Sequence, residues 1–172
     1  EDLKKIIFTD IEQSEKRRIE SDFRNRFIKV LVAANPVEVP SSLLKEQKAI
    51  LIEDVKKRMT DQGMSETEFS DYCQKWDKDF EATASEMVQA GFVIDTIAEK
   101  HNLHWTEADL EAKYEDYSKQ MGVKIEDVRK WYGESDQSGR LTYSITEEKV
   151  LAHLLKSANV KEVTKDKLSD LT

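Results

Sequence analysis

The sequence is poor in the residues that break helices. Among its 172 residues are 5 glycines and 2 prolines, about a third of what average usage gives for this length. Sandwiches and barrels of β-strands need frequent turns, where glycine and proline are the usual residues. The shortage therefore argues against an all-β fold and favours long helices in one domain or two small lobes.

Cysteine and long apolar runs are scarce as well. The single cysteine, Cys73, excludes a disulfide framework and fits a reducing compartment. No run of about 18 apolar residues occurs, so the sequence predicts no membrane-spanning helix. No basic leader followed by an apolar segment opens the chain, and no signal peptide is predicted. Because the chain begins at Glu1 rather than at methionine, we expect a fragment or a processed product, from which a leader could have been removed.

Charge is plentiful, and its balance is acidic. Charged residues make up 36% of the chain, with 27 basic against 35 acidic side chains and a net charge of −8. Lys16, Arg17 and Arg18 form a tight basic cluster, and acidic residues interleave with it. Because nucleic-acid binding needs a concentrated basic face, this balance disfavours DNA or RNA as a partner. The apolar fraction of 38% is low and predicts a thin, elongated core.

A long helix and an extended connector open the chain. Apolar residues keep mostly to helical spacing over residues 1–34, with a polar middle that predicts a solvated centre and a packed end. Asn35-Pro36 ends this helix, because the residue before a proline is pushed out of the helical region. Residues 35–40 then hold both prolines, and the alternation from Val37 to Val39 predicts that one side of the connector packs.

Two further helical stretches are marked by their ends. A second helix begins at Pro40 or Ser41 and is closed by Gly63. Ser65 and Glu68 have the spacing of a capping box, and they open a third helix over residues 66–101. The second half of that helix is apolar on nearly all sides, so we expect it to be buried while the first half projects.

The last third predicts shorter helices. Thr106 and Asp109 have box-like spacing and open a fourth helix that stops at Gly122. A short fifth helix covers about 124–132, residues 133–139 read as a loop, and a sixth helix runs to about Ala158. The charged tail from Asn159 has few apolar residues, so we expect it to be loosely ordered.

Residue types that carry chemistry form no coherent catalytic or metal site. His101 and His104 have a metal-ligand spacing, but a zinc site needs three or four ligands and no second cysteine exists. A nucleophilic pair of Cys73 with His101 or His153 is disfavoured, because the thiol sits on an apolar helical stripe. A calcium loop over residues 134–145 fails because apolar Ile145 stands where a carboxylate must coordinate. We therefore predict no enzyme activity, no cofactor and no metal for this chain.

Aromatic and methionine side chains are the remaining candidates for function. Trp131 and Tyr132 are neighbours on a short helix, so both cannot face the same point of a core. Methionine is flexible and polarisable and suits surfaces that bind varied apolar partners. Each of these residues can equally be ordinary core filling, and the sequence leaves both readings open.

The connector carries a recognisable motif, Asn35-x-Val37-x-Val39-Pro40-x-x-Leu43-Leu44-x-x-Gln47. It resembles the hinge of bacterial trigger factor, a family of ribosome-associated chaperones, with Gln47 where glutamate is usual. Residues 91–94 and 102–103 resemble the segment that closes the family's first arm, and Trp131-Tyr132 stands where its second arm has an aromatic pair. The resemblance extends over residues 1 to about 163. The family's ribosome-docking loop and β-rich isomerase domain are not found, so the chain looks like an isolated C-terminal chaperone domain.

The resemblance implies an all-α fold with an elongated multi-helix body and five parts. These are a linker helix (1–34), a hinge (35–40), a first arm (41–104), a second arm (105–158) and a tail (159–172). It implies an ATP-independent chaperone domain of the cytoplasm that binds apolar segments of unfolded or nascent polypeptides in a helical cradle. Ribosome binding and prolyl isomerase activity would belong to domains absent here, and a homodimer stays open. A body like that of the periplasmic chaperone SurA would require export, and a helical adaptor for one specific partner is the alternative function.

Nine side chains are the candidate contacts for such a client. Five match apolar positions of the family's arms: Phe80, Tyr117, Met121, Val128 and Trp131. Three in the first arm rest mainly on the hydrophobic pattern, namely Met59, Met64 and Phe69. Tyr132 completes the set as the partner of Trp131. For every one of them, packing between helices is the competing interpretation.

Overall fold

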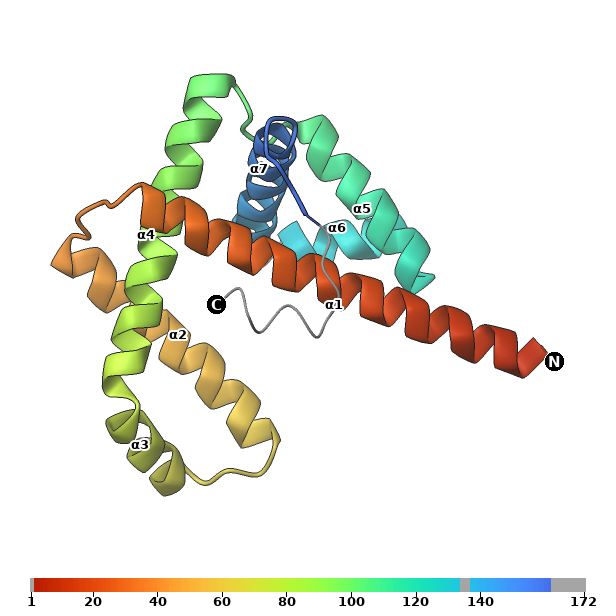
Figure 1. The fold of residues 1–172 in the computed structure, drawn as a ribbon. Helices are drawn as coiled ribbons and strands as arrows, with labels where there is room; N and C mark the ends of the chain where they lie inside the picture. The colour runs from red at the N-terminus through yellow and green to blue at the C-terminus, as the bar shows by residue number, and fades with distance from the viewer. Residues whose placement is uncertain (1, 134–136, 162–172) are drawn as a thin grey trace. The chain divides into compact units, whose positions relative to one another are not determined.

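The computed structural model describes residues 2–133 and 137–161, and these contain seven α-helices and no strand (Figure 1). The helices are α1 (Asp2–Ala34), α2 (Ser41–Asp61), α3 (Glu66–Lys75), α4 (Asp77–His101), α5 (Glu107–Met121), α6 (Ile125–Gly133) and α7 (Gln137–Leu155). The all-α prediction is confirmed. None of the described helices combines the length and the apolar content needed to cross a membrane.

Contacts divide the chain into two compact units, Glu1–Val93 and Ile94–Thr172. The division falls within α4. The reason is that the last turns of α4 pack on α7: Ile94 and Ala98 are buried in one cluster with Val150. The last turns of α4 therefore belong with the interior of the second unit.

In the first unit, α1 is solvated along most of its length and packed near its end. Every described side chain from Ile7 to Asp22 is exposed, whereas Leu31 is half-buried and Val32 is buried. The solvated middle is stabilised on its own surface, where Arg18 pairs with Glu15 at 2.8 Å. Both features follow the predicted pattern of a polar middle and an apolar end.

The connector between α1 and α2 is held at both ends. Asn35 closes α1 by donating from its side-chain Nδ2 to the carbonyl of Leu31 at 2.8 Å. Val37 and Val39 are half-buried and Glu38 is exposed, so one side of the connector packs as predicted. The carbonyl of Val37 accepts a hydrogen bond of 2.9 Å from Nε2 of Gln89 on α4. This bond ties the hinge motif to a helix 52 residues further along the chain.

The turn from α2 to α3 is built by a glycine and a capping box. Gly63 has a φ of +93°, a conformation that favours glycine, and the N–H of Met64 donates to the carbonyl of Met59 at 3.0 Å. Ser65 then caps α3, accepting from the N–H of Glu68 while the Glu68 carboxylate accepts from the N–H of Ser65. These hydrogen bonds hold the Glu68 carboxylate in its charged form and lower its pKa.

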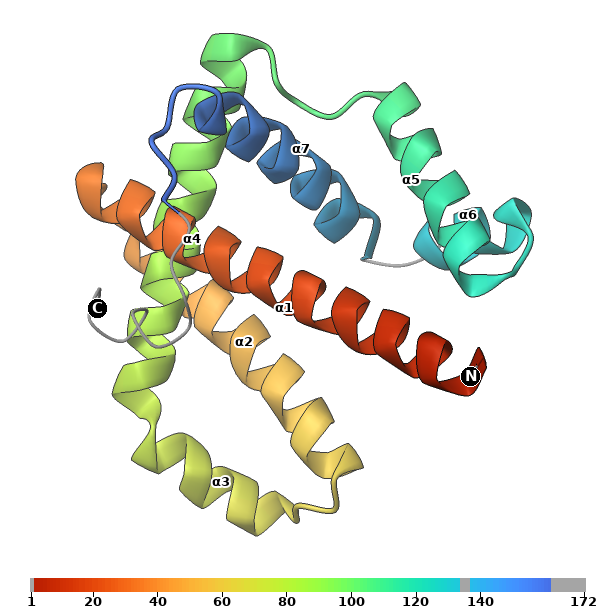
Figure 2. The same cartoon turned by 45° about the vertical axis from the view of Figure 1, so that its right-hand side comes forward.

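The single helix predicted over residues 66–101 is wrong, because the structure breaks it at Trp76 into α3 and α4. Trp76 has φ −106° and ψ 19°, and Figure 2 shows α3 turned away from the direction of α4. Asp77 and Asp79 occupy the first turn of α4, where negative charge is favoured. Lys48 on α2 pairs with Asp77 at 2.8 Å and with Glu81 at 3.4 Å, which fixes this helix start in place.

The second half of that stretch is only partly buried, contrary to the expectation. Ala84, Val93 and Ile94 are buried, but Met87 keeps 47% of its surface exposed. A helix that is apolar on all sides is buried only where neighbours cover every side. Here the neighbours cover Met87 only in part.

The second unit has its largest interior between α5, α6 and α7. Tyr114, Val128, Leu141 and Ile145 are its buried centre. The predicted capping box at Thr106 and Asp109 opens α5, and Gly122, with a φ of +67°, ends it as expected. The predicted loop at 133–139 is shorter than expected, since α7 begins at Gln137; residues 134–136 and most of the tail, 162–172, lie outside the described residues.

Candidate binding surfaces of the two units

Trp131 and Tyr132 face different directions on α6. The ring of Tyr132 stacks on Tyr117 at 5.4 Å between centroids and lies 6.2 Å from the ring of Tyr114. Trp131 keeps 50% of its surface exposed. Adjacent residues on a helix point about 100° apart, so the packed tyrosine fixes the helix rotation that turns the tryptophan outward.

The remaining candidates of the second unit divide in the same way. Met121, at the end of α5, is 57% exposed, whereas Val128 has no exposed surface and belongs to the core. Tyr117 is half-buried against that core, and burial, reinforced by neighbouring Tyr132, raises the pKa of its hydroxyl. Trp131 and Met121 are therefore the candidates that a client can reach, while Val128 supports them from within.

Charged pairs link the helices of the second unit. Arg129 on α6 pairs with Glu111 on α5, and the carboxylate raises the pKa of the guanidinium. Lys113 on α5 pairs with Glu148 on α7 at 2.8 Å. Exposed pairs of this kind contribute little stability individually, because water and salt screen them.

In the first unit, the two candidate methionines meet at the α2–α3 turn. The backbone hydrogen bond from Met64 to Met59 joins them directly, and both side chains are half-buried. Phe69 and Phe80 are buried, at 6% and 7% exposure. Their rings lie 6.4 and 6.1 Å from the ring of Tyr72, so they pack α3 against α4. These two phenylalanines support the surface and do not form it.

Outside α1, four exposed large apolar side chains of the first unit were not among the sequence candidates. They are Leu43, Ile50, Trp76 and Met87, each between 38% and 47% exposed. Trp76 lies at the helix break, with the Lys75 ammonium 5.5 Å from its ring centroid. The helical spacing of Trp76 from Tyr72 and Phe80 favours a core position. Trp76 is exposed instead, at a helix break that the sequence pattern did not reveal.

The histidines and the cysteine form no site of three or more ligands. Within residues 2–133 and 137–161, no group of three His, Cys, Asp or Glu side chains lies close enough to hold a metal ion. His101 contacts His153 with ring centroids 4.4 Å apart, and Nδ1 of His104 lies 3.9 Å from Asp95. Cys73 is half-buried, and burial, with Asp77 adding to it, raises the pKa of its thiol.

Comparison with known proteins decides the family. The family model described as bacterial trigger factor protein (TF) C-terminus matches residues 1–156. The chain belongs to the trigger factor family. It is 52% identical over 170 residues to a trigger factor from Bdellovibrio bacteriovorus, covering 99% of this chain and 39% of that relative. Trigger factors from Syntrophotalea carbinolica and Geotalea daltonii are each 31% identical over 99% and 98% of the chain.

The match to trigger factor covers part of the relatives and nearly all of this chain. The chain spans 39% of the length of these three trigger factors, and the family model places the matched part at their C-terminus. No solved structure matches the chain. The resemblance first indicated by the hinge motif is thereby confirmed, and the matched segment includes every candidate side chain discussed above.

Proposed function

We propose that this trigger factor segment is an ATP-independent chaperone domain that binds apolar segments of unfolded or nascent polypeptides and limits their aggregation. Trigger factor relatives indicate a chaperone family. The observation that carries the proposal is the orientation of α6, whose packed Tyr132 holds Trp131 half-exposed. Large apolar side chains held outward by a fixed helix offer a client contact area at little entropic cost.

The expected strength of one such contact suits a chaperone that must release its client. Burying roughly 100 Å² of apolar surface contributes about 2.5 kcal/mol, whereas a millimolar dissociation constant already requires about 4 kcal/mol. A single side chain therefore holds a client only weakly. Several contacts along one client chain strengthen each other through effective concentration.

Both units offer such contacts. Trp131 and Met121 are exposed in the second unit, and Trp76, Met87 and Ile50 are exposed in the first. The half-buried pair Met59 and Met64 adds adaptable side chains at the α2–α3 turn. The net charge of −8 keeps a protein with these apolar residues soluble.

Catalysis and ribosome contact are not assigned to this chain. The family model that matches is not a catalytic one, and the β-rich isomerase domain is not in this chain. We place prolyl isomerase activity and ribosome binding in other parts of the whole protein, and client binding in the cytoplasm. These assignments rest on family membership.

A helical adaptor for one specific partner is the competing function. Such an adaptor needs one continuous, well-matched apolar face. The exposed apolar residues here are instead spread over separate helices of two units. Dispersed contacts favour varied unfolded clients.

The test compares two exposed apolar residues. Trp131→Ser removes a proposed contact, and Ile19→Ser removes a residue of α1 that is 60% exposed and outside the proposed surface. Binding of a fluorescent, permanently unfolded polypeptide is measured by anisotropy. We expect the dissociation constant to rise about three- to tenfold for Trp131→Ser and to stay unchanged for Ile19→Ser. Equal effects of the two variants would contradict the proposed site.

A further inference from the structure

Two histidines from different helices of the second unit lie in contact. The ring centroids of His101 and His153 are 4.4 Å apart, and the ring planes are inclined to each other by 38°. By sequence spacing the partner of His101 is His104, but His104 instead lies near Asp95, with its Nδ1 3.9 Å from the carboxylate. The structure therefore brings together two imidazoles that lie far apart in the chain.

The packing of α4 on α7 places the two rings beside each other. Ala98 and Val150 have no exposed surface and belong to the cluster that joins these helices. His101 follows Ala98 by one helical turn and His153 follows Val150 by one turn, so both histidines share the packed faces of their helices. His101 is exposed and His153 is half-buried. A metal ion can therefore reach the pair from solvent, while the interface behind it holds the two rings in place.

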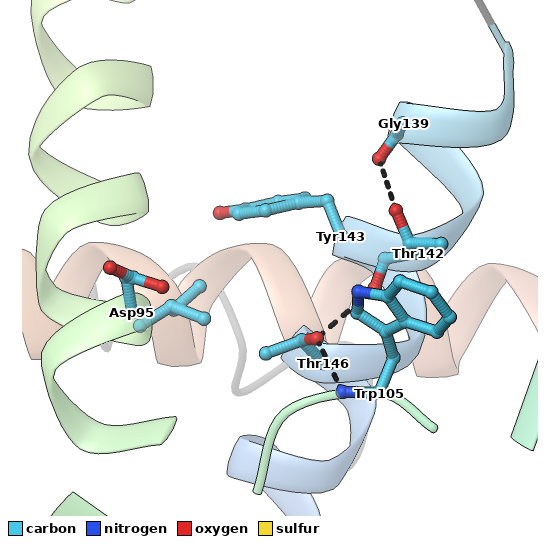
Figure 3. Close-up of a pocket in the computed structure, with 7 residues that line it drawn as sticks. Asp95, Trp105, Gly139, Thr142, Tyr143 and Thr146 are labelled. Atoms are coloured by element: carbon cyan, nitrogen blue, oxygen red, sulfur yellow. Dashed lines mark hydrogen bonds between the residues drawn. The ribbon is translucent and has the colours of Figure 1, made fainter. Parts of the chain in front are cut away.

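The connection after α4 is also fixed against α7. The N–H of Leu103 returns to the carbonyl of Ala98 at 2.8 Å and closes the end of α4. The N–H of Trp105 donates to the hydroxyl of Thr146 on α7 at 3.1 Å, beside a pocket of about 190 Å³ that Figure 3 shows. These bonds limit the movement of the helix end that carries His101, which lowers the entropic cost of binding an ion there.

Two helix C-termini meet at the histidine pair. His101 is the last residue of α4, and His153 lies in the last turn of α7. The free carbonyl groups at a helix C-terminus carry partial negative charge, which favours a cation nearby. The neighbouring Lys100 and Lys156 are exposed, so water and salt screen their charges. The backbone therefore adds to the attraction that the two imidazoles offer a metal cation.

The separation of the two rings favours some metal ions over others. The bond from a metal ion to an imidazole nitrogen is about 2.0–2.1 Å long, so two imidazoles bound at a right angle have ring centroids roughly 4.5 Å apart, and two bound at the tetrahedral angle roughly 5.2 Å. The observed 4.4 Å matches the right angle. Square-planar or tetragonal sites of nitrogen and oxygen ligands are typical of Cu²⁺ and Ni²⁺, whereas Zn²⁺ prefers tetrahedral sites.

We propose that His101 and His153 form a two-ligand site for Cu²⁺ or Ni²⁺, with water molecules completing the coordination. Each imidazole contributes one ring nitrogen. A bound ion joins the end of α4 to α7 and stabilises the second unit, because only the folded chain holds both ligands together. The site does not depend on client binding, so the proposal stands or falls separately from the proposed function.

The test is a calorimetric titration of the untagged, metal-free chain with Ni²⁺. We expect one ion to bind per chain. His101→Ala and His153→Ala should each raise the dissociation constant by about tenfold or more, since even the loss of an outer-shell partner of a metal ion costs that much. His104→Ala is the matched control, because His104 is an exposed histidine outside the pair, and this variant should change the dissociation constant less than twofold. An equal loss of affinity in His104→Ala and His101→Ala would overturn the assignment.

Two further measurements separate a ligand role from a structural one. The electron paramagnetic resonance spectrum with one equivalent of Cu²⁺ should show coupling to two imidazole nitrogens in the wild type and to one in His153→Ala. Ni²⁺ at about a hundredfold excess over its dissociation constant should raise the melting temperature of the wild type by about 5 °C, and that of His153→Ala by much less. Mg²⁺, which prefers oxygen ligands, should leave it unchanged.

The metal-free variants should keep the helicity of the wild type, measured by circular dichroism, so that a loss of affinity reports the loss of a ligand. A Cu²⁺ spectrum of the wild type without coupling to two imidazole nitrogens would overturn the proposal. A melting temperature of the wild type that Ni²⁺ leaves unchanged would overturn it as well.

Discussion

Lys149 on α7 donates a hydrogen bond of 2.7 Å from Nζ to Oδ2 of Asp109, the residue that completes the capping box of α5. The same ammonium reaches the carbonyl of His104, just before that helix. One lysine thus anchors the start of α5 and the connection before it to α7. This contact also secures the segment that carries Trp105.

The Asp109 contacts predict a defined acid sensitivity. The hydrogen bond from Lys149, followed by that from Thr106, lowers the pKa of Asp109 below its ordinary value of 3.8. Because the folded-state pKa is the lower one, the stabilisation is complete above 3.8 and is lost as the pH falls through the folded-state value. Asp109→Asn should therefore lower the melting temperature clearly at about pH 7 and much less at about pH 3. Thermal unfolding by circular dichroism measures both melting temperatures. A difference between the wild type and Asp109→Asn that grows as the pH falls would contradict the prediction.

Substitutions of Val128 and Trp131 should differ in their effect on the stability of the fold. Val128 is fully buried, so Val128→Ala should lower the free energy of unfolding by about 2 kcal/mol. Trp131 is half-exposed, so Trp131→Ser should change it by about 0.5 kcal/mol or less. Urea unfolding of both variants gives the two values. A larger loss for Trp131→Ser would place that side chain in the core.

The hinge should loosen when its hydrogen bond to α4 is removed. Gln89→Leu leaves the carbonyl of Val37 without the bond that it accepts at 2.9 Å. An unsatisfied, partly buried carbonyl costs about 1–3 kcal/mol locally. We expect faster amide hydrogen exchange in residues 37–39, measured by mass spectrometry. Gln74→Leu, a change at an exposed position of α3, should leave the exchange of these residues as in the wild type.

Cys73 should react slowly while the chain is folded. Burial and the nearby Asp77 raise the pKa of its thiol, which lowers the fraction of reactive thiolate at neutral pH. We expect reaction with a chromogenic disulfide reagent to be at least tenfold faster in urea than in buffer. Equal rates in urea and in buffer would show that the fold neither shields the thiol nor raises its pKa.

Much of the fold could be predicted from local signals. Ser65 and Thr106 mark helix starts, and Gly63 and Gly122 mark helix ends, because capping and positive φ depend on a few neighbouring residues. The break at Trp76 was missed, because its sequence keeps helical spacing throughout. At that break Asp77 pairs with Lys48, which lies far away in the sequence.

The candidate surfaces were less predictable, because they too depend on contacts between residues that lie apart in the sequence. Tyr132 and Trp131 are equally apolar, and only packing against Tyr117 decides which of them faces outward. Val128 matched a family position but is core. The pocket beside Trp105 depends on a hydrogen bond to Thr146 across 41 residues, which no local pattern reports.

The central claim is that this trigger factor segment acts as a chaperone by itself. Light scattering of a chemically unfolded model protein, diluted with and without the chain and with no nucleotide, tests it most directly. We predict that near-stoichiometric amounts suppress aggregation and that Trp131→Ser suppresses it less. Aggregation that proceeds unchanged beside a folded, monomeric chain would contradict the account and favour the adaptor for one specific partner.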